Sequence, residues 1–537
     1  MEVKELGREF RGTRIAPVNS VESPMPSPLP QASSCETVVQ IGIFFDGTGN
    51  RLDPISGPSA LSNVARLHYT YPDFQSLGSH RIYVPGLGTR FPLIGEDSDS
   101  TSGGAFASGG DGRIIFAILR VIDALHWTLF NTMMFGRQRI KALCNASPSE
   151  PEEKIIQQLG LLGNLVDDTD GARREKFLNV CLQDMRNRMQ TAKVPKICTC
   201  FLDVFGFSRG AAEARVFCHW INDLLSNSSL AGIPVRFRFL GVMDTVASVG
   251  MLDAISNRRA TGGHSEWAMP DVMRILPSVD NCVHFVAMHE LRKSFPLDTV
   301  LIDHVLPSNC LEIAYPGSHS DVGGGYAFGE LGVSGSDSLK LSQIPLNHMF
   351  DCAIKAGVPL SKKLLSEDDK GFFAIDKELQ IAFDQFLNES TEAPRRLADW
   401  AFPYLVWRWQ IRQMYQNTEQ VRKADAEDRR FLLEANTYFC LSDEQIKSSP
   451  AYRRISSRKR VFFGHAEHQA NLLHLELEAP ALRARIEAQP KISPALAEFF
   501  DKFVHDSVAG FRKQFVEASG HWRYRRVFRG SATPSID

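Results

Sequence analysis

The chain has 537 residues, of which 43% are hydrophobic, an ordinary fraction for a soluble globular protein. Lys and Arg number 60 and Asp and Glu 62, so the formal net charge of −2 excludes an overall positive field that would attract nucleic acid. A chain of this length exceeds a single hydrophobic core, and we expect two or so domains or one elaborated domain.

The N-terminal segment, residues 1–37, is expected to form a tail ahead of the folded core. Residues 1–5 include no apolar run, so we expect no secretory signal peptide. Residues 17–34 are rich in Pro and Ser, a composition that favours an extended, disordered leader. A docking peptide for a carrier protein is the alternative interpretation.

A short apolar segment over residues 38–45 predicts a buried strand that runs directly into the glycine-rich loop 46–50. The loop matches neither G-x-x-x-x-G-K-[ST] nor G-x-G-x-x-G, so it does not indicate a nucleotide site. A loop of this kind after an early strand can supply one backbone donor to an oxyanion formed in acyl transfer. We therefore predict that Gly47 or Thr48 has this role.

The longest apolar run covers residues 114–130 and is interrupted by Arg120, Asp123 and His126 at near-helical spacing. This pattern predicts an amphipathic helix packed in the core rather than a membrane span. The ten cysteines include no C-x-x-C pair, which favours reduced thiols over a zinc site. We expect neither a metal nor an organic cofactor.

The most informative motif is the G-x-S-x-G pentapeptide at residues 206–210. The apolar residues before it predict a buried strand, and the apolar residues at four-residue spacing after it predict a helix. A strand, a glycine-flanked turn and a helix together indicate a nucleophile elbow, because only glycine lets strand and helix approach closely around the serine. Ser208 is then the nucleophile, and the amide of Arg209 is one donor to the oxyanion.

A serine nucleophile of this type needs an acid and a histidine further along the chain, each beyond a strand. Asp244 directly follows an apolar segment, residues 235–243, that predicts a strand entering the core. His319 lies in a glycine-rich loop after residues 311–315, a second predicted strand. We predict that His319 is the general base and that Asp244 orients it. Asp46 and Asp321 are competing acids and His505 is the alternative base.

Several motifs in order along the chain resemble those of type VI secretion lipase effectors, in particular family one of these antibacterial phospholipases. The motifs cover residues 44–50, 83–89, 206–212, 241–246 and 317–326, with further similarity at 504–511 and 524–530. The resemblance implies a triad of Ser208, Asp244 and His319. It also implies an A-type phospholipase, a carboxylic ester hydrolase that acts on membrane phospholipid.

The resemblance further implies how such an enzyme reaches its substrate. It would be made in the cytoplasm, exported without a signal peptide on a secretion spike protein, and released in the periplasm of a target bacterium, while a cognate immunity protein protects the producer. Two alternatives stay open. One is a non-enzymatic spike-associated protein with a vestigial elbow, and the other is an esterase or peptidase of another substrate class.

We expect an α/β-hydrolase-like, mainly parallel sheet over residues 38–360 and a mainly helical region over 361–537, because strand patterns give way to charged helical sequence after about residue 360.

Aromatic residues between 400 and 409 form the centre of this second region. They would either bury themselves against the hydrolase core or form a patch at a membrane interface. The basic cluster at 453–460 would suit anionic lipid, although a solvated face is the simpler interpretation.

Overall fold

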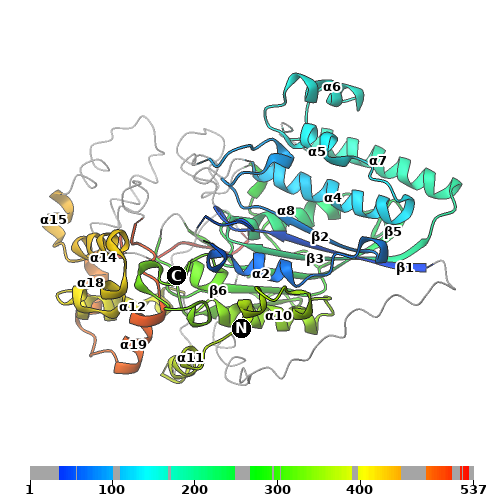
Figure 1. Cartoon of the computed structure of the whole chain (residues 1–537). Coiled ribbons are helices and arrows are strands. Elements are labelled where there is room, and N and C mark those ends of the chain that lie inside the picture. Colours follow the sequence, from blue (N-terminus) through cyan, green and yellow to red (C-terminus); the bar gives the residue numbers. More distant parts are fainter. Residues whose placement is uncertain are drawn as a thin grey trace.

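The structure is a computed structural model that describes residues 36–530 except 56, 101–108, 167, 169–170, 248–265, 293–294, 303, 390–396, 449–478, 511–519 and 523 (Figure 1). The Pro/Ser-rich segment 17–34 and the basic cluster 453–460 lie outside the described residues. The first described element, β1, begins at Glu36.

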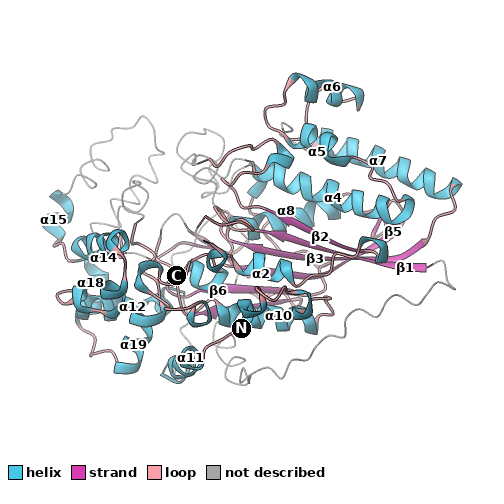
Figure 2. Ribbon diagram, in the orientation of Figure 1, coloured by secondary structure: helices cyan, strands magenta, loops and turns pink. Residues whose placement is uncertain are grey.

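A seven-stranded sheet in the order β2-β1-β3-β5-β6-β8 forms the centre of the molecule. The six strands on this path pair in parallel, and only the short β4 pairs with β5 in antiparallel fashion. Because parallel strands need crossover connections, helices cover both faces of the sheet, as Figure 2 shows. The expected mainly parallel α/β architecture is confirmed. The strands are β1 Glu36–Phe45, β2 Ser79–Val84, β3 Lys196–Phe207, β4 Ser229–Leu230, β5 Ile233–Met243, β6 Cys282–Ala287 and β8 Cys310–Tyr315.

The remaining regular structure is mainly α-helical. Those before β8 are α2 Asn63–Tyr69, α4 Gly110–Phe130, α5 Gly136–Cys144, α6 Glu150–Gln158, α7 Ala172–Thr191 and α8 Arg209–Asp223. Those after it are α9 His319–Gly323, α10 Gln343–Lys355, α11 Lys377–Glu389, α12 Leu397–Ile411, α13 Glu419–Lys423, α14 Ala426–Phe439, α15 Asp443–Ser448, α18 Ala479–Glu487 and α19 Pro494–Phe503. None of the helices within the described residues combines the length and apolarity of a membrane span.

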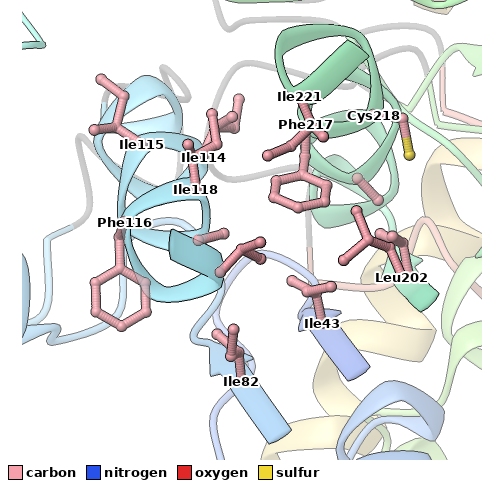
Figure 3. Packing of buried hydrophobic residues seen from close by; sticks show 14 of the residues in the cluster. Ile43, Ile82, Ile114, Ile115, Phe116, Ile118, Leu202, Phe217, Cys218 and Ile221 are labelled. Carbon is pink, nitrogen blue, oxygen red and sulfur yellow. The ribbon is translucent and has the colours of Figure 1, made fainter. Parts of the chain in front are cut away.

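Two hydrophobic clusters cover the two faces of the sheet. On one face, Ile114 and Ile118 of α4 and Phe217 of α8 pack with sheet residues such as Ile43 and Leu202 (Figure 3). The predicted amphipathic helix is therefore α4, and its apolar side is part of the core. On the other face, α2 and α10 pack against phenylalanines of the sheet. Alternate residues of β1 belong to opposite clusters, as the two-residue period of a strand requires.

The C-terminal helices extend the second cluster rather than forming a separate core. Tyr404 and Trp407 of α12 and Phe500 of α19 belong to the same cluster as Phe44 and Phe205 of the sheet. Trp400, Tyr404 and Trp407 are all buried. Of the two interpretations of this aromatic centre, burial against the core is therefore the one the structure supports. A small parallel pairing joins β7, Leu297–Asp298, to β9, Val527–Phe528, near the end of the described chain.

The carboxyl ends of the central strands meet at one edge of the sheet. Phe45 pairs with both Val84 and Gly206, Phe207 pairs with Met243, and Met243 pairs with Phe285. Residues that directly follow these strands are therefore brought together, and in open parallel sheets this edge is where ligands bind.

Candidate active site

Ser208 lies in a sharp turn between β3 and α8. Its backbone angles, φ 58° and ψ −126°, are costly for a residue with a side chain. The flanking glycines make the turn possible, because a Cβ on Gly206 would lie 2.6 Å from Cα of Ala211, and a Cβ on Gly210 would lie 2.3 Å from the carbonyl oxygen of Asp46. The strand, turn and helix predicted around the pentapeptide are all present. This is the backbone of a nucleophile elbow.

His319 and Asp244 lie beside each other at the same edge of the sheet. Asp244 directly follows β5 with φ 42°, and His319 begins α9 after β8. The distance from Nδ1 of His319 to Oδ2 of Asp244 is 2.6 Å, and both side chains are buried. Nε2 of His319 is also buried and makes no hydrogen bond with any part of the chain that the structure describes. It is the ring nitrogen left to accept a proton from a serine hydroxyl.

Two aromatic rings lie close to the imidazole of His319. The ring of Phe207 lies 4.6 Å from the His319 ring and that of Phe295 4.8 Å, measured between centroids. Burial lowers the pKa of His319, and this effect exceeds the opposing effect of the Asp244 carboxylate. The imidazole is therefore neutral near neutral pH, as a general base must be.

Arg525 lies 281 residues after Asp244 and also contacts this pair, although its immediate sequence context predicts no such role. Its Nη1 donates to Oδ2 of Asp244 and its Nη2 to Oδ1, each at 2.8 Å. Burial by itself would raise the pKa of Asp244, but Arg525 and His319 together hold that pKa below its usual range. The carboxylate is thus ionised in a buried position. The only signal in the sequence was the similarity noted over residues 524–530.

The loop after β1 lies against the elbow, as its predicted role requires. A Cβ on Gly47 would lie 2.5 Å from Cδ1 of Phe207, the residue before Ser208. The Gly47 amide donates to Oδ1 of Asp46 at 2.7 Å, and the hydroxyl of Thr48 is buried without a hydrogen-bond partner among the described residues. The oxyanion roles of Arg209, Gly47 and Thr48 stay predictions.

The competing acids and the alternative histidine have other partners. Asp46 accepts from the Gly47 amide and from the Tyr83 hydroxyl, and burial raises its pKa to about 6. The Asp321 carboxylate lies 2.6 Å from Nδ1 of His505 and also accepts from Ser318. The chain therefore contains a second histidine–carboxylate pair, and the acid that contacts His319 is Asp244.

Within the described residues, no group of three or more His, Cys, Asp or Glu side chains is placed to hold a metal ion. The described cysteines are free thiols. The side chains brought to this edge of the sheet include a serine hydroxyl, an imidazole and a carboxylate, which are the groups that acyl transfer uses.

Comparison with known proteins gives a family match over part of the chain. Residues 226–352 match the family described as T6SS, phospholipase effector Tle1-like, catalytic domain. The matched segment contains Asp244 and His319 and begins after Ser208. The match confirms, over these residues, the resemblance that the motifs indicated, and it indicates a lipolytic hydrolase. No curated protein shows significant similarity to the chain.

Solved structures give further similarity. An uncharacterized protein from Pseudomonas aeruginosa aligns with a TM-score of 0.66 and 25% identity, covering 92% of this chain and 80% of that chain. A structure of the Tle1 effector bound to the VgrG spike from the type 6 secretion system aligns with a TM-score of 0.36 and 17% identity, covering 66% of this chain and 79% of that one.

Proposed function

We propose that this chain, which carries a Tle1-like phospholipase effector domain of type VI secretion over residues 226–352, hydrolyses a carboxylic ester of membrane phospholipid as an A-type phospholipase. The observation that carries the proposal is the contact of 2.6 Å between His319 and Asp244 at the sheet edge that also holds the Ser208 elbow. The phospholipid substrate rests on the family match, because a fold alone does not fix a substrate.

The proposed reaction follows the acyl-enzyme route. Oγ of Ser208 attacks the ester carbonyl carbon while Nε2 of His319 takes the hydroxyl proton. The tetrahedral oxyanion is stabilised by the amide of Arg209 and by an amide of Gly47 or Thr48. The carbon–oxygen bond to the glycerol then breaks, and the leaving alkoxide takes the proton from His319, which leaves an acylated Ser208 and a lysophospholipid.

The second half of the reaction regenerates the enzyme. Water attacks the acyl carbonyl while His319 again accepts the proton, and its return to Oγ of Ser208 releases a fatty acid. Asp244 stays ionised throughout and stabilises the transient imidazolium. No group outside these side chains and backbone amides is required for either half.

Delivery is part of the proposal. A phospholipase made in the cytoplasm would have to be kept from its own membrane or exported promptly. We propose that a secretion spike protein carries this chain into the periplasm of a target bacterium and that an immunity protein protects the producer. The family description, which names type VI secretion, supports this route.

Expression with an added periplasmic signal peptide tests the proposed activity in the compartment where the protein would act. We expect the full chain to be toxic to a bacterium that lacks the immunity protein, and we expect lysophospholipid and free fatty acid to accumulate in its membranes. Ser208→Ala, exported to the same level, should produce neither effect. Equal toxicity of the two proteins would show that poisoning does not proceed through ester hydrolysis and would favour a non-enzymatic effector.

A further inference from the structure

The segment that reaches the acid–base pair from the far end of the chain is residues 524–530, here called the C-terminal arm. Its strand β9 pairs with β7. The amide of Asp298 in β7 donates to the carbonyl of Thr245 at 2.9 Å, and Thr245 is the residue after Asp244. The arm is thereby anchored beside Asp244. Arg525 lies two positions before Val527, the first residue of β9, and its side chain is buried.

The contacts of Asp244 leave no carboxylate oxygen without a donor. Oδ2 faces Nδ1 of His319 at 2.6 Å and Nη1 of Arg525 at 2.8 Å. Oδ1 accepts from the Ala287 amide and from Nη2 of Arg525, both at 2.8 Å. Nη2 also donates to the Ala287 carbonyl at 2.8 Å, so the guanidinium is itself fixed to the end of β6. A planar two-point contact of this kind sets orientation as well as charge.

We propose that Arg525 is a positioning residue for the reaction: it fixes the plane of the Asp244 carboxylate toward His319 and keeps the pair in its unprotonated, active form as the pH falls. The inference rests on the proposed function, since it presupposes that Ser208, His319 and Asp244 perform hydrolysis.

The direction of the charge effect follows from counting protons on the pair. The active form is a neutral imidazole with a carboxylate, and one added proton gives an imidazolium–carboxylate pair that cannot accept the serine proton. A fixed cation disfavours that added proton wherever on the pair it resides. Removing the cation should therefore raise the apparent pKa of the pair, and activity should be lost at a higher pH than in the unmodified protein.

The other charged or titratable side chains near His319 and Asp244 contact each other. Glu290 accepts from the His319 amide at 3.2 Å and is bound by Arg292, whose guanidinium contacts it at 2.8 Å. His284 of β6, behind Asp244, lies 2.8 Å from Glu312 of β8. Among the described residues, Arg525 is the cationic side chain in direct contact with the Asp244 carboxylate apart from His319 itself. Arg292 lowers the pKa of His319 and Glu290 raises it, so these two effects oppose each other. We therefore expect the charge of Arg525 to set the acid limit of activity.

Two substitutions separate charge from geometry. Arg525→Gln removes the charge, and we expect the acid limb of kcat/KM to move up by about one pH unit, the lower end of shifts caused by an adjacent opposite charge. Arg525→Lys keeps the charge but not the two-point contact, so its acid limb should stay near that of the unmodified protein while its plateau rate falls. The matched control is Arg408→Gln, which disrupts a buried contact of 3.2 Å with Asp506. It should lower the melting temperature and leave the acid limb in place.

The pH profile should be measured on the full chain with two reactions: hydrolysis of phospholipid vesicles, and inactivation by an organophosphonate that modifies a triad serine without needing lipid. A shifted acid limb in the organophosphonate reaction with no phospholipid hydrolysis would contradict the proposed substrate and support the role of Arg525.

Three outcomes would overturn the inference: the acid limb of Arg525→Gln does not move, the acid limb of Arg408→Gln moves equally far, or the acid limb of Arg525→Lys moves as far as that of Arg525→Gln. An unmodified protein whose Ser208 does not react would also overturn it. If Arg525→Gln does not fold, Arg525→Lys alone tests the inference. Its acid limb must stay at the pH found for the unmodified protein while its plateau rate falls below that of the unmodified protein.

Discussion

Replacing Ser208 with Ala is expected to lower ester hydrolysis by about 10⁴-fold or more while leaving the fold intact. In the proposed mechanism the hydroxyl oxygen forms the bond to the acyl group, and alanine has no atom that can replace it. The backbone at this position is strained with either residue, so the substitution changes the chemistry and leaves the turn unchanged. Turnover of a soluble ester and of phospholipid vesicles, together with the thermal unfolding temperature, gives the measurement.

Ser507→Ala is the matched control, because it also removes a buried serine hydroxyl, one without a hydrogen-bond partner among the described residues. It should retain nearly full activity. Turnover of phospholipid by Ser208→Ala at more than a small fraction of the rate of the unmodified protein would exclude the acyl-enzyme mechanism.

The second large effect concerns the pair of His319 and Asp244, and it is compared with the buried pair of His505 and Asp321. Asp244→Asn and His319→Ala should each reduce turnover by about 10⁴-fold, because the imidazole loses its tautomer and its charge partner in the first case and is absent in the second. The loss should appear in kcat rather than in KM, since the pair acts on the transition state. Steady-state kinetics on a soluble ester, normalised to folded protein, measures it.

Asp321→Asn and His505→Ala are the corresponding controls in the second pair, which has the same contact of 2.6 Å and the same burial. Breaking either buried pair is expected to cost several kcal/mol of stability, so all four variants should unfold at lower temperature. Only those at Asp244 and His319 should lose activity beyond the loss of folded protein. Near-normal turnover of Asp244→Asn beside an inactive Asp321→Asn or Asp46→Asn would mean that the acid is misassigned.

Much of the site could be predicted from the sequence because its determinants are local. An apolar strand that ends in a glycine-flanked serine needs no distant information. Asp244 directly follows β5, and His319 lies in the loop shortly after β8. The parallel sheet then brings these residues together, because the carboxyl ends of its strands lie at one edge. The segments before Ser208 and Asp244 were predicted as strands for the same reason.

The contacts that come from far along the chain could not be predicted in this way. Arg525 is one of several arginines in a short basic segment, and nothing in its neighbours distinguishes it from Arg526. His505 was considered as an alternative base because of its sequence context, but its partner, Asp321, is 184 residues away. The boundary expected near residue 360 likewise depends on tertiary packing, and Phe500 packs in the same cluster as Phe44 of the sheet. Pairings of this kind are set by the fold as a whole.

The central claim is that Ser208 forms an acyl-enzyme with a phospholipid acyl chain, and mass spectrometry tests it most directly. The purified full chain is mixed with vesicles of a phospholipid carrying two different acyl chains, quenched with acid and digested. We expect an acyl group on the peptide that contains Ser208, together with free fatty acid and lysophospholipid in the lipid fraction. Hydrolysis with no acyl group on Ser208, or release of a phosphorylated head group in place of fatty acid, would contradict the account.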